Sequence, residues 1–346
     1  MTNPVQEVQR LGQSIWYDNI RRGLITSGKL QKLIDLGVSG LTSNPTIFEK
    51  AIAGSTDYDE ALVKLSAEVP SAETKDAGAL FEALALEDIR AAADLLRPTY
   101  DRTGGADGFA SLEVSPNLAH DTDGTVKEAQ RLFAALDRPN VMVKVPATPE
   151  GIPAIRRLIG EGINVNVTLI FSLDYYRDVK EAYISGLEDL ADSGGDVSSV
   201  SSVASFFISR VDAAIDGLLE KRIRDGNADV AGLLGKAAIA NAKLAYRDFQ
   251  ETFEGERFAA LRAKGGRVQR PLWASTGTKS PAYSDVLYLD SLIGPDTVNT
   301  VPEATLTAFI DHGVAAETLK TGVQEAEAAV RAVEQAGISM ESVTAK

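Results

Sequence analysis

Val141-Met142-Val143-Lys144-Val145-Pro146 is a short β-like run that carries a lysine among valines. Because successive side chains of a strand point to opposite faces, the three valines share one face and Lys144 takes the other. The valine face suits packing against helices. The charge on the opposite face, near the end of the strand, has to be explained by the fold or by a function.

Seven further runs of this kind alternate with longer helical patterns, which is typical of repeated βα units and a parallel sheet. In chain order the eight expected strands are Ser14–Ile20, Gly40–Thr46, Gly108–Val114, Val141–Pro146, Asn164–Ile170, Ser202–Ile208, Arg270–Thr276 and Thr297–Pro302. The clearest helices between them are Asp76–Leu96, Thr125–Leu136, Tyr175–Leu190 and Asp212–Ile223. Eight units favour a closed (β/α)8 barrel, and no G-x-G-x-x-G motif follows a strand, which disfavours a dinucleotide-binding sheet.

The 346 residues are expected to form one α/β domain, residues 1–346, although length alone suggests about two. Two stretches between strands, about 49–107 and 212–269, have room for more than one helix. Neither shows a composition shift or a Pro/Ser-rich linker. We interpret both as helical insertions in a single barrel.

Composition excludes several function classes. Lys plus Arg number 35 against 49 Asp plus Glu, and the resulting net charge of −14 repels nucleic acid and anionic membranes. The chain has no Cys and only two His, so disulfides and Cys- or His-rich metal sites are excluded, while carboxylate sites stay open. We expect no metal and no cofactor. Without a signal peptide or a membrane-length apolar run, a cytoplasmic protein is expected; an oligomer is neither predicted nor excluded.

Five of the expected strands point polar side chains inward near their C-terminal ends. These side chains belong to Asp18, Asn44, Glu113, Lys144, Asn166 and Thr168. Barrel interiors are normally filled by Val, Ile and Leu, and barrel enzymes keep their chemistry at the C-terminal face. Any one of these residues can have a purely structural role, with its hydrogen bonds made inside the protein. An unpaired buried charge, however, costs several kcal/mol. The set therefore predicts an active site in the mouth of the barrel.

A lysine inside a barrel can bind an anion, or it can act as a nucleophile once burial disfavours its charged form. The valines beside Lys144 favour the second role. A neutral amine attacks a ketone or aldehyde to give a Schiff base, which is an electron sink for breaking the adjacent C–C bond. Asp18 and Glu113 can move protons, while Thr168 and Asn44 can hold a water and a substrate hydroxyl.

A second group of residues predicts an anion site. Arg210 lies just beyond the sixth strand, and Ser275-Thr-Gly-Thr-Lys279 follows the seventh. Loops after the last barrel strands frequently bind phosphate, and hydroxyls, backbone amides and cations are suitable donors. Taken alone, a loop of this composition is more often just a polar turn. Its position favours the phosphate role.

Several motifs together resemble the transaldolase family, in particular its long bacterial subgroup. They are Trp16-Tyr-Asp18, Gly40-Leu-Thr-Ser-Asn-Pro-Thr46, Ser111-Leu-Glu-Val-Ser115, Val141–Thr148, Gly162–Ser172, Trp273–Lys279 and Tyr283–Tyr288. The resemblance keeps motif order over essentially the whole chain. It implies a metal-free class I transferase of the pentose phosphate pathway. Such an enzyme moves a dihydroxyacetone unit from sedoheptulose 7-phosphate to glyceraldehyde 3-phosphate, giving erythrose 4-phosphate and fructose 6-phosphate.

The resemblance also implies catalytic roles. Lys144 would be the Schiff-base lysine, and Asp18 would take the proton from the C4 hydroxyl during cleavage. Glu113, with Thr168, would hold the water used in carbinolamine dehydration.

The implied substrate-binding residues are Asn44, Asn166, Ser205, Phe207, Arg210, Ser275 and Lys279. Asn44 and Asn166 would bind the dihydroxyacetone hydroxyls with Ser205 beside them, and Phe207 would shield the intermediate. Arg210 and Ser275 would hold phosphate. Many transaldolases place a second arginine just after the seventh strand. This chain offers Lys279 there, so its phosphate geometry is expected to differ.

Two other functions fit parts of the pattern. A fructose 6-phosphate aldolase-like enzyme would release the three-carbon unit by protonation instead of passing it to an acceptor aldehyde. Those relatives are much shorter and typically carry Tyr where this chain has Glu113. A silent phosphosugar-binding or scaffold protein is the other alternative, but it would have no need to keep the charged set around Lys144.

Overall fold

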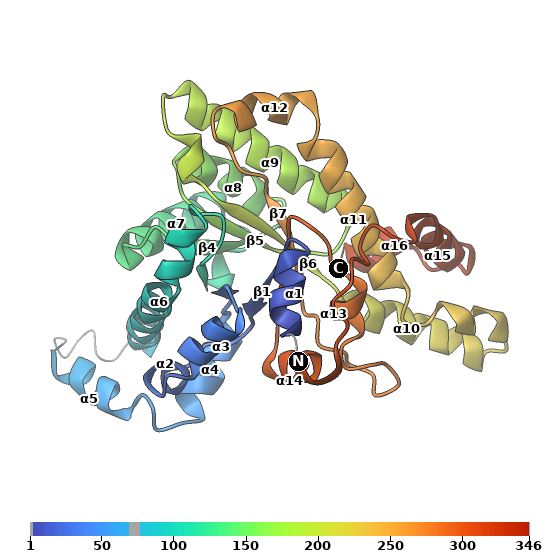
Figure 1. Cartoon of the computed structure of the whole chain (residues 1–346), viewed down its shortest axis with the longest axis horizontal. Coiled ribbons are helices and arrows are strands. Elements are labelled where there is room, and N and C mark those ends of the chain that lie inside the picture. Colours follow the sequence, from blue (N-terminus) through green and yellow to red (C-terminus); the bar gives the residue numbers. More distant parts are fainter. Residues whose placement is uncertain (1–2, 69–76, 346) are drawn as a thin grey trace.

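Within residues 3–68 and 77–345, which the computed structural model describes, eight parallel strands close into a barrel surrounded by helices (Figure 1). The strands are β1 Gln13–Tyr17, β2 Gly40–Leu41, β3 Ala110–Glu113, β4 Val141–Pro146, β5 Val165–Ile170, β6 Ser202–Phe207, β7 Arg270–Ala274 and β8 Thr297–Val301. Each pairs with the next, and β8 pairs with β1. The predicted (β/α)8 barrel is confirmed.

The helices cover the outside of the barrel. They are α1 Pro4–Arg10, α2 Arg22–Thr26, α3 Lys29–Leu36, α4 Pro45–Ala53, α5 Asp59–Glu68, α6 Ala77–Arg102, α7 Thr122–Leu136, α8 Gly151–Gly160, α9 Leu173–Asp192, α10 Ser209–Arg224, α11 Ala237–Phe253, α12 Glu256–Ala263, α13 Leu287–Ser291, α14 Glu303–His312, α15 Val323–Gln335 and α16 Met340–Thr344. Short 3₁₀ turns are η1 Pro116–Leu118, η2 Val197–Ser199 and η3 Ala228–Leu233. The four helices predicted from periodicity all form, although residue 76 of the first lies outside the described residues.

The stretches interpreted as insertions are helical. The first, 49–107, contains α5 and α6, with residues 69–76 outside the described part. The second, 212–269, contains η3, α11 and α12 as well as most of α10. The division of the chain into a single domain stays a prediction. No described helix is both long and apolar enough to cross a membrane.

The alternation along β4 separates two apolar cores. Val141, Val143 and Val145 are fully buried in the cluster that joins strands to helices. Met142 instead belongs to an inner cluster with Trp16, Leu272 and Val298, which fills the barrel. Lys144 shares the parity of Met142, so its side chain lies in the layer above this inner plug. The inward orientation predicted from the valines is confirmed.

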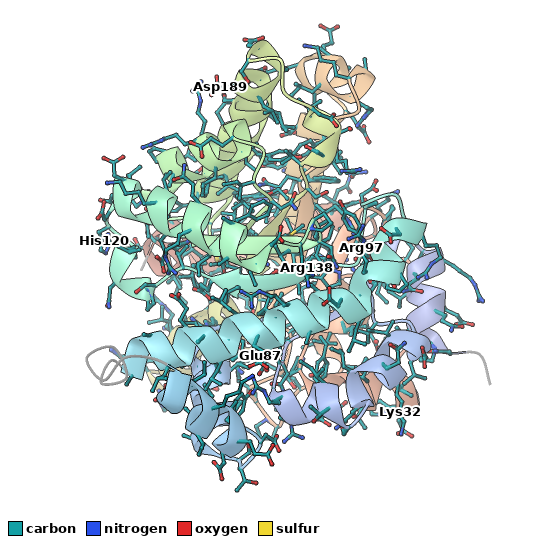
Figure 2. All side chains as sticks on the ribbon, turned by 90° about the vertical axis from the view of Figure 1, so that its left-hand side faces the viewer. Lys32, Glu87, Arg97, His120, Arg138 and Asp189 are labelled. Atoms are coloured by element: carbon teal, nitrogen blue, oxygen red, sulfur yellow. The ribbon has the colours of Figure 1, made fainter. Side chains whose placement is uncertain are left out.

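Charged side chains lie on the outer faces of the helices. Figure 2 shows Glu87 and Arg97 on α6, together with Arg138 and Asp189, at the surface. Arg138 pairs with Asp94 at 2.6 Å, and Arg97 with Asp101 at 2.7 Å. Exposed pairs of this kind contribute only about 0–1 kcal/mol each. The two apolar cores, rather than these ion pairs, hold the barrel together.

Two predicted strands are wrong in detail. Gly40–Thr46 was expected to be extended throughout, but β2 ends at Leu41 and Asn44 is the N-cap of α4. The Asn44 side chain accepts a hydrogen bond from the Ile47 amide at 2.9 Å, and Pro45 occupies the first helical position. An Asn-Pro pair is a strong helix-start signal. It overrides the strand pattern here.

In β5 the alternation breaks near the end. The sequence pattern places Leu169 with Val165 and Val167 toward the helices, but Leu169 is 38% exposed. The β5–β6 register shifts between Val167 and Ile170, and Leu169 has a left-handed φ of 62°. A bulge of this kind turns a side chain toward the opposite face. Leu169 consequently lines the cavity described next.

Candidate active site

A cavity of about 620 Å³ opens at the C-terminal ends of the strands. Every strand ends beside a residue that lines it, from Asp18 after β1 to Thr300 in β8. The residues predicted from sequence that line it are Asp18, Asn44, Glu113, Lys144, Thr168, Ser205, Phe207, Arg210, Ser275 and Lys279. Asn166 is the predicted residue that does not line it. The barrel thus brings together side chains that are far apart in the sequence.

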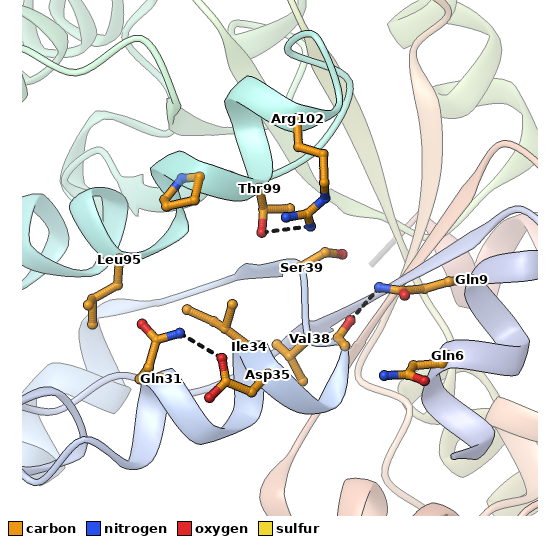
Figure 3. Close-up of a pocket in the computed structure, with 12 residues that line it drawn as sticks. Gln6, Gln9, Gln31, Ile34, Asp35, Val38, Ser39, Leu95, Thr99 and Arg102 are labelled. Carbon is orange, nitrogen blue, oxygen red and sulfur yellow. Dashed lines mark hydrogen bonds between the residues drawn. The ribbon is translucent and has the colours of Figure 1, made fainter. Parts of the chain in front are cut away.

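A second hollow, of about 400 Å³, lies near the opposite end of the barrel (Figure 3). It is lined by residues of α1, α3 and α6 and by Ser39, which precedes β2. Its polar groups bond to one another: Gln31 donates to Asp35 at 2.8 Å and Arg102 to Thr99 at 3.2 Å. The described residues lining it include no lysine, so the predicted chemistry belongs to the C-terminal cavity.

Strand register sets the centre of the site. Glu113 pairs with Lys144 across β3 and β4, and Lys144 pairs with Asn166 across β4 and β5. The Lys144 Nζ atom donates to Glu113 Oε2 at 3.0 Å and to the Ser43 carbonyl at 2.9 Å. Lys144 is only 7% exposed, yet it lines the cavity. A buried amine is therefore both paired with a carboxylate and open to a ligand.

Asn166 lies one layer below the cavity. It is fully buried and accepts a hydrogen bond from Ser205 Oγ at 2.7 Å, while its amide donates to Ser111 Oγ at 3.2 Å. Ser205 and Thr168 are each 2% exposed and line the cavity. Asn166 thus contacts a residue of the cavity wall, Ser205, without lining the cavity itself.

Asp18 directly follows β1 and lines the same cavity as Lys144. Its Oδ1 atom accepts a hydrogen bond from Thr42 Oγ1 at 2.8 Å, and Thr42 also bonds Thr300 Oγ1 at 2.6 Å. Burial raises the pKa of the Asp18 carboxyl above its ordinary value, against the opposing effects of the Thr42 hydrogen bond and the Lys144 charge. Burial outweighs these opposing effects, so Asp18 holds a proton at higher pH than a free aspartate does.

Cations gather on the β6–β7 side of the cavity. Arg210, in the first turn of α10, lies with its guanidinium 5.0 Å from the centre of the Phe207 ring. Ser275 adopts a left-handed φ of 57°, and its hydroxyl lies 2.9 Å from that of Ser209. Neither Arg210 nor Lys279 forms an ion pair within the part of the chain that the structure describes. Cations without carboxylate partners at a cavity wall are suited to an anionic ligand.

Sequence reasoning missed several residues that line the cavity, chiefly Thr42, Thr46, Lys50 and Thr300. Lys50 comes from α4. It follows Thr46 by four residues, and this spacing places both on one helix face. The helix-start signal at Asn44 would have revealed that face. The described residues include no group of three or more His, Asp or Glu side chains placed to hold a metal ion.

Comparisons with known proteins agree with this geometry. Residues 15–346 match the family described as Transaldolase/Fructose-6-phosphate aldolase. A protein named Transaldolase 1 from Streptomyces avermitilis is 51% identical, covering 99% of this chain and 90% of its own. Proteins named Transaldolase from Thiobacillus denitrificans and Trichodesmium erythraeum are 48% and 47% identical, covering 99% and 94% of this chain and 94% and 86% of their own. The chain therefore belongs to the transaldolase/fructose-6-phosphate aldolase family, as its motifs predicted.

Proposed function

We propose that this chain is a transaldolase, a transferase that carries a dihydroxyacetone unit on Lys144 from a ketose phosphate to an aldose phosphate. Full-length similarity to proteins named transaldolase supports the activity. The observation that carries the mechanism is the buried Lys144–Glu113 pair in a cavity whose wall carries Arg210 and Lys279, which form no ion pair among the described residues. Sedoheptulose 7-phosphate and fructose 6-phosphate are the donors, and glyceraldehyde 3-phosphate and erythrose 4-phosphate the acceptors, of this pentose phosphate pathway reaction.

The first half of the reaction builds the electron sink. The Lys144 amine attacks the C2 carbonyl of the donor to form a carbinolamine. Glu113, 3.0 Å from Nζ, takes a proton from the amine and, through a water held with Thr168, returns one to the departing hydroxyl. The protonated hydroxyl leaves C2 as a water molecule, which gives the protonated Schiff base. Asn44 and Ser205, the latter oriented by Asn166, bind the donor hydroxyls.

The second half breaks and remakes a C–C bond. Asp18 takes the proton of the C4 hydroxyl, the C3–C4 bond breaks, and its electron pair moves into the protonated Schiff base to give an enamine on Lys144. The shortened aldose phosphate leaves. An acceptor aldehyde then adds to the enamine, Asp18 returns the proton, and hydrolysis frees the amine. Phe207 covers the enamine against protonation by solvent.

An assay of product partition tests the activity against its nearest alternative. Incubated with fructose 6-phosphate and erythrose 4-phosphate, a transaldolase forms sedoheptulose 7-phosphate in step with glyceraldehyde 3-phosphate. A fructose 6-phosphate aldolase releases free dihydroxyacetone whether or not an acceptor is present. Steady release of dihydroxyacetone without acceptor would contradict the proposal.

A cytoplasmic location and the absence of nucleic-acid binding stay predictions from composition.

Arg210 is proposed to bind the substrate phosphate. Arg210→Ala removes a charge-assisted hydrogen bond worth about 1.5–3 kcal/mol, so kcat/KM for glyceraldehyde 3-phosphate should fall roughly 10- to 150-fold. The value for unphosphorylated glyceraldehyde should change little. Acceptor kinetics are informative because the three-carbon unit is already on the enzyme when the acceptor binds. Equal losses for both acceptors would reassign Arg210 to a structural role.

The acid limb of the pH profile of kcat/KM should report the ionisation of the Asp18 carboxyl. Because only the ionised carboxylate can take the C4 proton, kcat/KM for the donor should fall as pH drops through the Asp18 pKa, which burial raises above its ordinary value. Thr42→Val removes a hydrogen bond that stabilises the ionised form, so it should move this limb to still higher pH. The matched control is Thr125→Val in α7, which removes a buried hydroxyl that donates to the Leu118 carbonyl. An acid limb that does not move in Thr42→Val, or that moves equally in both variants, would contradict the assignment.

A further inference from the structure

One face of α10 is bonded to the segment that follows β7. Ser209, Asp212 and Asp216 have the i, i+3, i+7 spacing that places them on a single helix face. Each side chain has a partner in residues 275–288, here called the post-β7 segment. Ser209 bonds Ser275, Asp212 bonds Tyr288 and Asp216 bonds Tyr283. Arg210 and Lys279, the proposed phosphate-binding cations, lie on the two elements that these bonds join.

Each aspartate uses both of its carboxylate oxygens. Asp216 accepts from the Tyr283 hydroxyl at 2.6 Å through Oδ2 and from the Gly235 amide at 3.0 Å through Oδ1. Asp212 accepts from the Tyr288 hydroxyl at 2.9 Å and from the Ala238 amide at 2.7 Å. Bonds to charged acceptors are roughly twice as strong as neutral ones. The carboxylates therefore hold the post-β7 segment against α10 and against the chain that leads into α11.

Gly235 is fitted to this contact. Its φ of +69° lies in the left-handed region, and a Cβ atom placed there would lie 2.8 Å from Cζ of Tyr283. A side chain at this position would displace the tyrosine ring. The glycine lets the backbone amide reach Asp216 while the ring packs directly above it.

We propose that Tyr283, through Asp216, is a positioning residue that fixes Lys279 opposite Arg210 for binding of the substrate phosphate. This inference rests on the proposed phosphate role of Arg210 and Lys279. A lysine is a point charge on a flexible stem, unlike the planar fork of an arginine. Its backbone has to be held in place if it is to supply a defined contact. Ser275 anchors the start of the loop and Tyr283 anchors it four residues beyond Lys279.

Tyr288 strengthens the same attachment from a more buried position. It is 1% exposed, whereas Tyr283 is only partly buried at the edge of the segment. Removing the Tyr288 hydroxyl would disturb the packing at the start of α13, so Tyr283 is the better residue to test. Tyr283→Phe deletes a single hydroxyl and leaves the ring over Gly235.

The experiment compares acceptor kinetics of the full chain. Tyr283→Phe should raise KM for glyceraldehyde 3-phosphate roughly 10-fold, the low end of what a hydrogen bond to a charged acceptor contributes. The kcat, and the kcat/KM for unphosphorylated glyceraldehyde, should stay within about twofold of the unmodified chain. Tyr246→Phe in α11 is the matched control. It removes a tyrosine hydroxyl that donates to the Pro295 carbonyl over a distance of 3.1 Å. It should change neither acceptor.

A double-mutant cycle with Asp216→Ala, which removes both carboxylate oxygens, sharpens the test. Because both substitutions break the same bond, the double variant should be about as impaired as the more impaired single variant. The inference would be overturned if the losses of the two single variants multiplied in the double variant. Equal losses for both acceptors, or an unchanged KM in Tyr283→Phe, would also overturn it. Arg210→Ala separates this failure from that of the proposed function. If Arg210→Ala is selective and Tyr283→Phe is not, only the positioning role is wrong; if Arg210→Ala is unselective, the phosphate role itself fails.

Discussion

Lys144→Met should lose transaldolase turnover by a factor on the order of 10⁴ or more, because it removes the amine that forms the covalent intermediate. Met keeps the length of the side chain and suits the apolar layer below it. The cavity should therefore persist while the amine is gone. Turnover is measured by coupled assay of glyceraldehyde 3-phosphate formation, and circular dichroism checks that the variant folds.

Lys180 supplies the control for this prediction. Burial lowers the pKa of Lys180 to about 8, which on titration alone makes it a candidate nucleophile. Its Nζ atom, however, donates to the Asp248 carbonyl at 2.7 Å and to Thr252 Oγ1 at 2.8 Å between α9 and α11. It does not line the cavity. A folded Lys180→Met variant should retain turnover; if it loses turnover while Lys144→Met retains it, the nucleophile has been misassigned.

Asp18→Ala should stop the reaction after the Schiff base has formed. The amine and the donor carbonyl are untouched, so Lys144 still condenses with fructose 6-phosphate. Without a base for the C4 hydroxyl, C–C cleavage should slow by about 10²–10⁴-fold. Borohydride reduction followed by intact-protein mass spectrometry should then find the full six-carbon phosphorylated adduct. A three-carbon adduct in this variant would mean that cleavage proceeds without Asp18.

Glu113→Gln should fail earlier in the same sequence. The amide keeps the shape of the side chain but cannot take a proton from Lys144 or return one to the carbinolamine hydroxyl. Less adduct of any length should be trapped at early times than in the unmodified chain. The opposite behaviour of the two carboxylate variants, accumulation in one and depletion in the other, distinguishes their roles. An equal loss of trapped adduct in both variants would contradict the separate roles assigned to Asp18 and Glu113.

The alternation of β4 was enough to predict the orientation of Lys144, because strand periodicity and burial act together there, while the barrel was predicted from the eight βα units along the chain. The same reasoning was wrong at Leu169, where a bulge reverses the alternation, and at Asn44, where a helix cap replaces the strand. Both exceptions lie in the mouth of the barrel. Strands end there, so local turn geometry outweighs the two-residue period.

Contacts across the chain were beyond sequence reasoning. Tyr283 and its acceptor Asp216 are 67 residues apart, and no periodicity links them. Asn166 was correctly predicted to point inward, but the Ser205 and Ser111 hydroxyls that bury it come from other strands. Such pairings follow from barrel closure and strand register, which a single sequence determines only through the complete fold.

The location of the trapped intermediate tests the central claim most directly. The unmodified chain is incubated with fructose 6-phosphate, reduced with borohydride, digested and mapped by mass spectrometry. The account predicts a reduced three-carbon adduct on the peptide that contains Lys144, with Lys180 and Lys279 unmodified. An adduct on another lysine, or none in an enzyme that turns over, would contradict it.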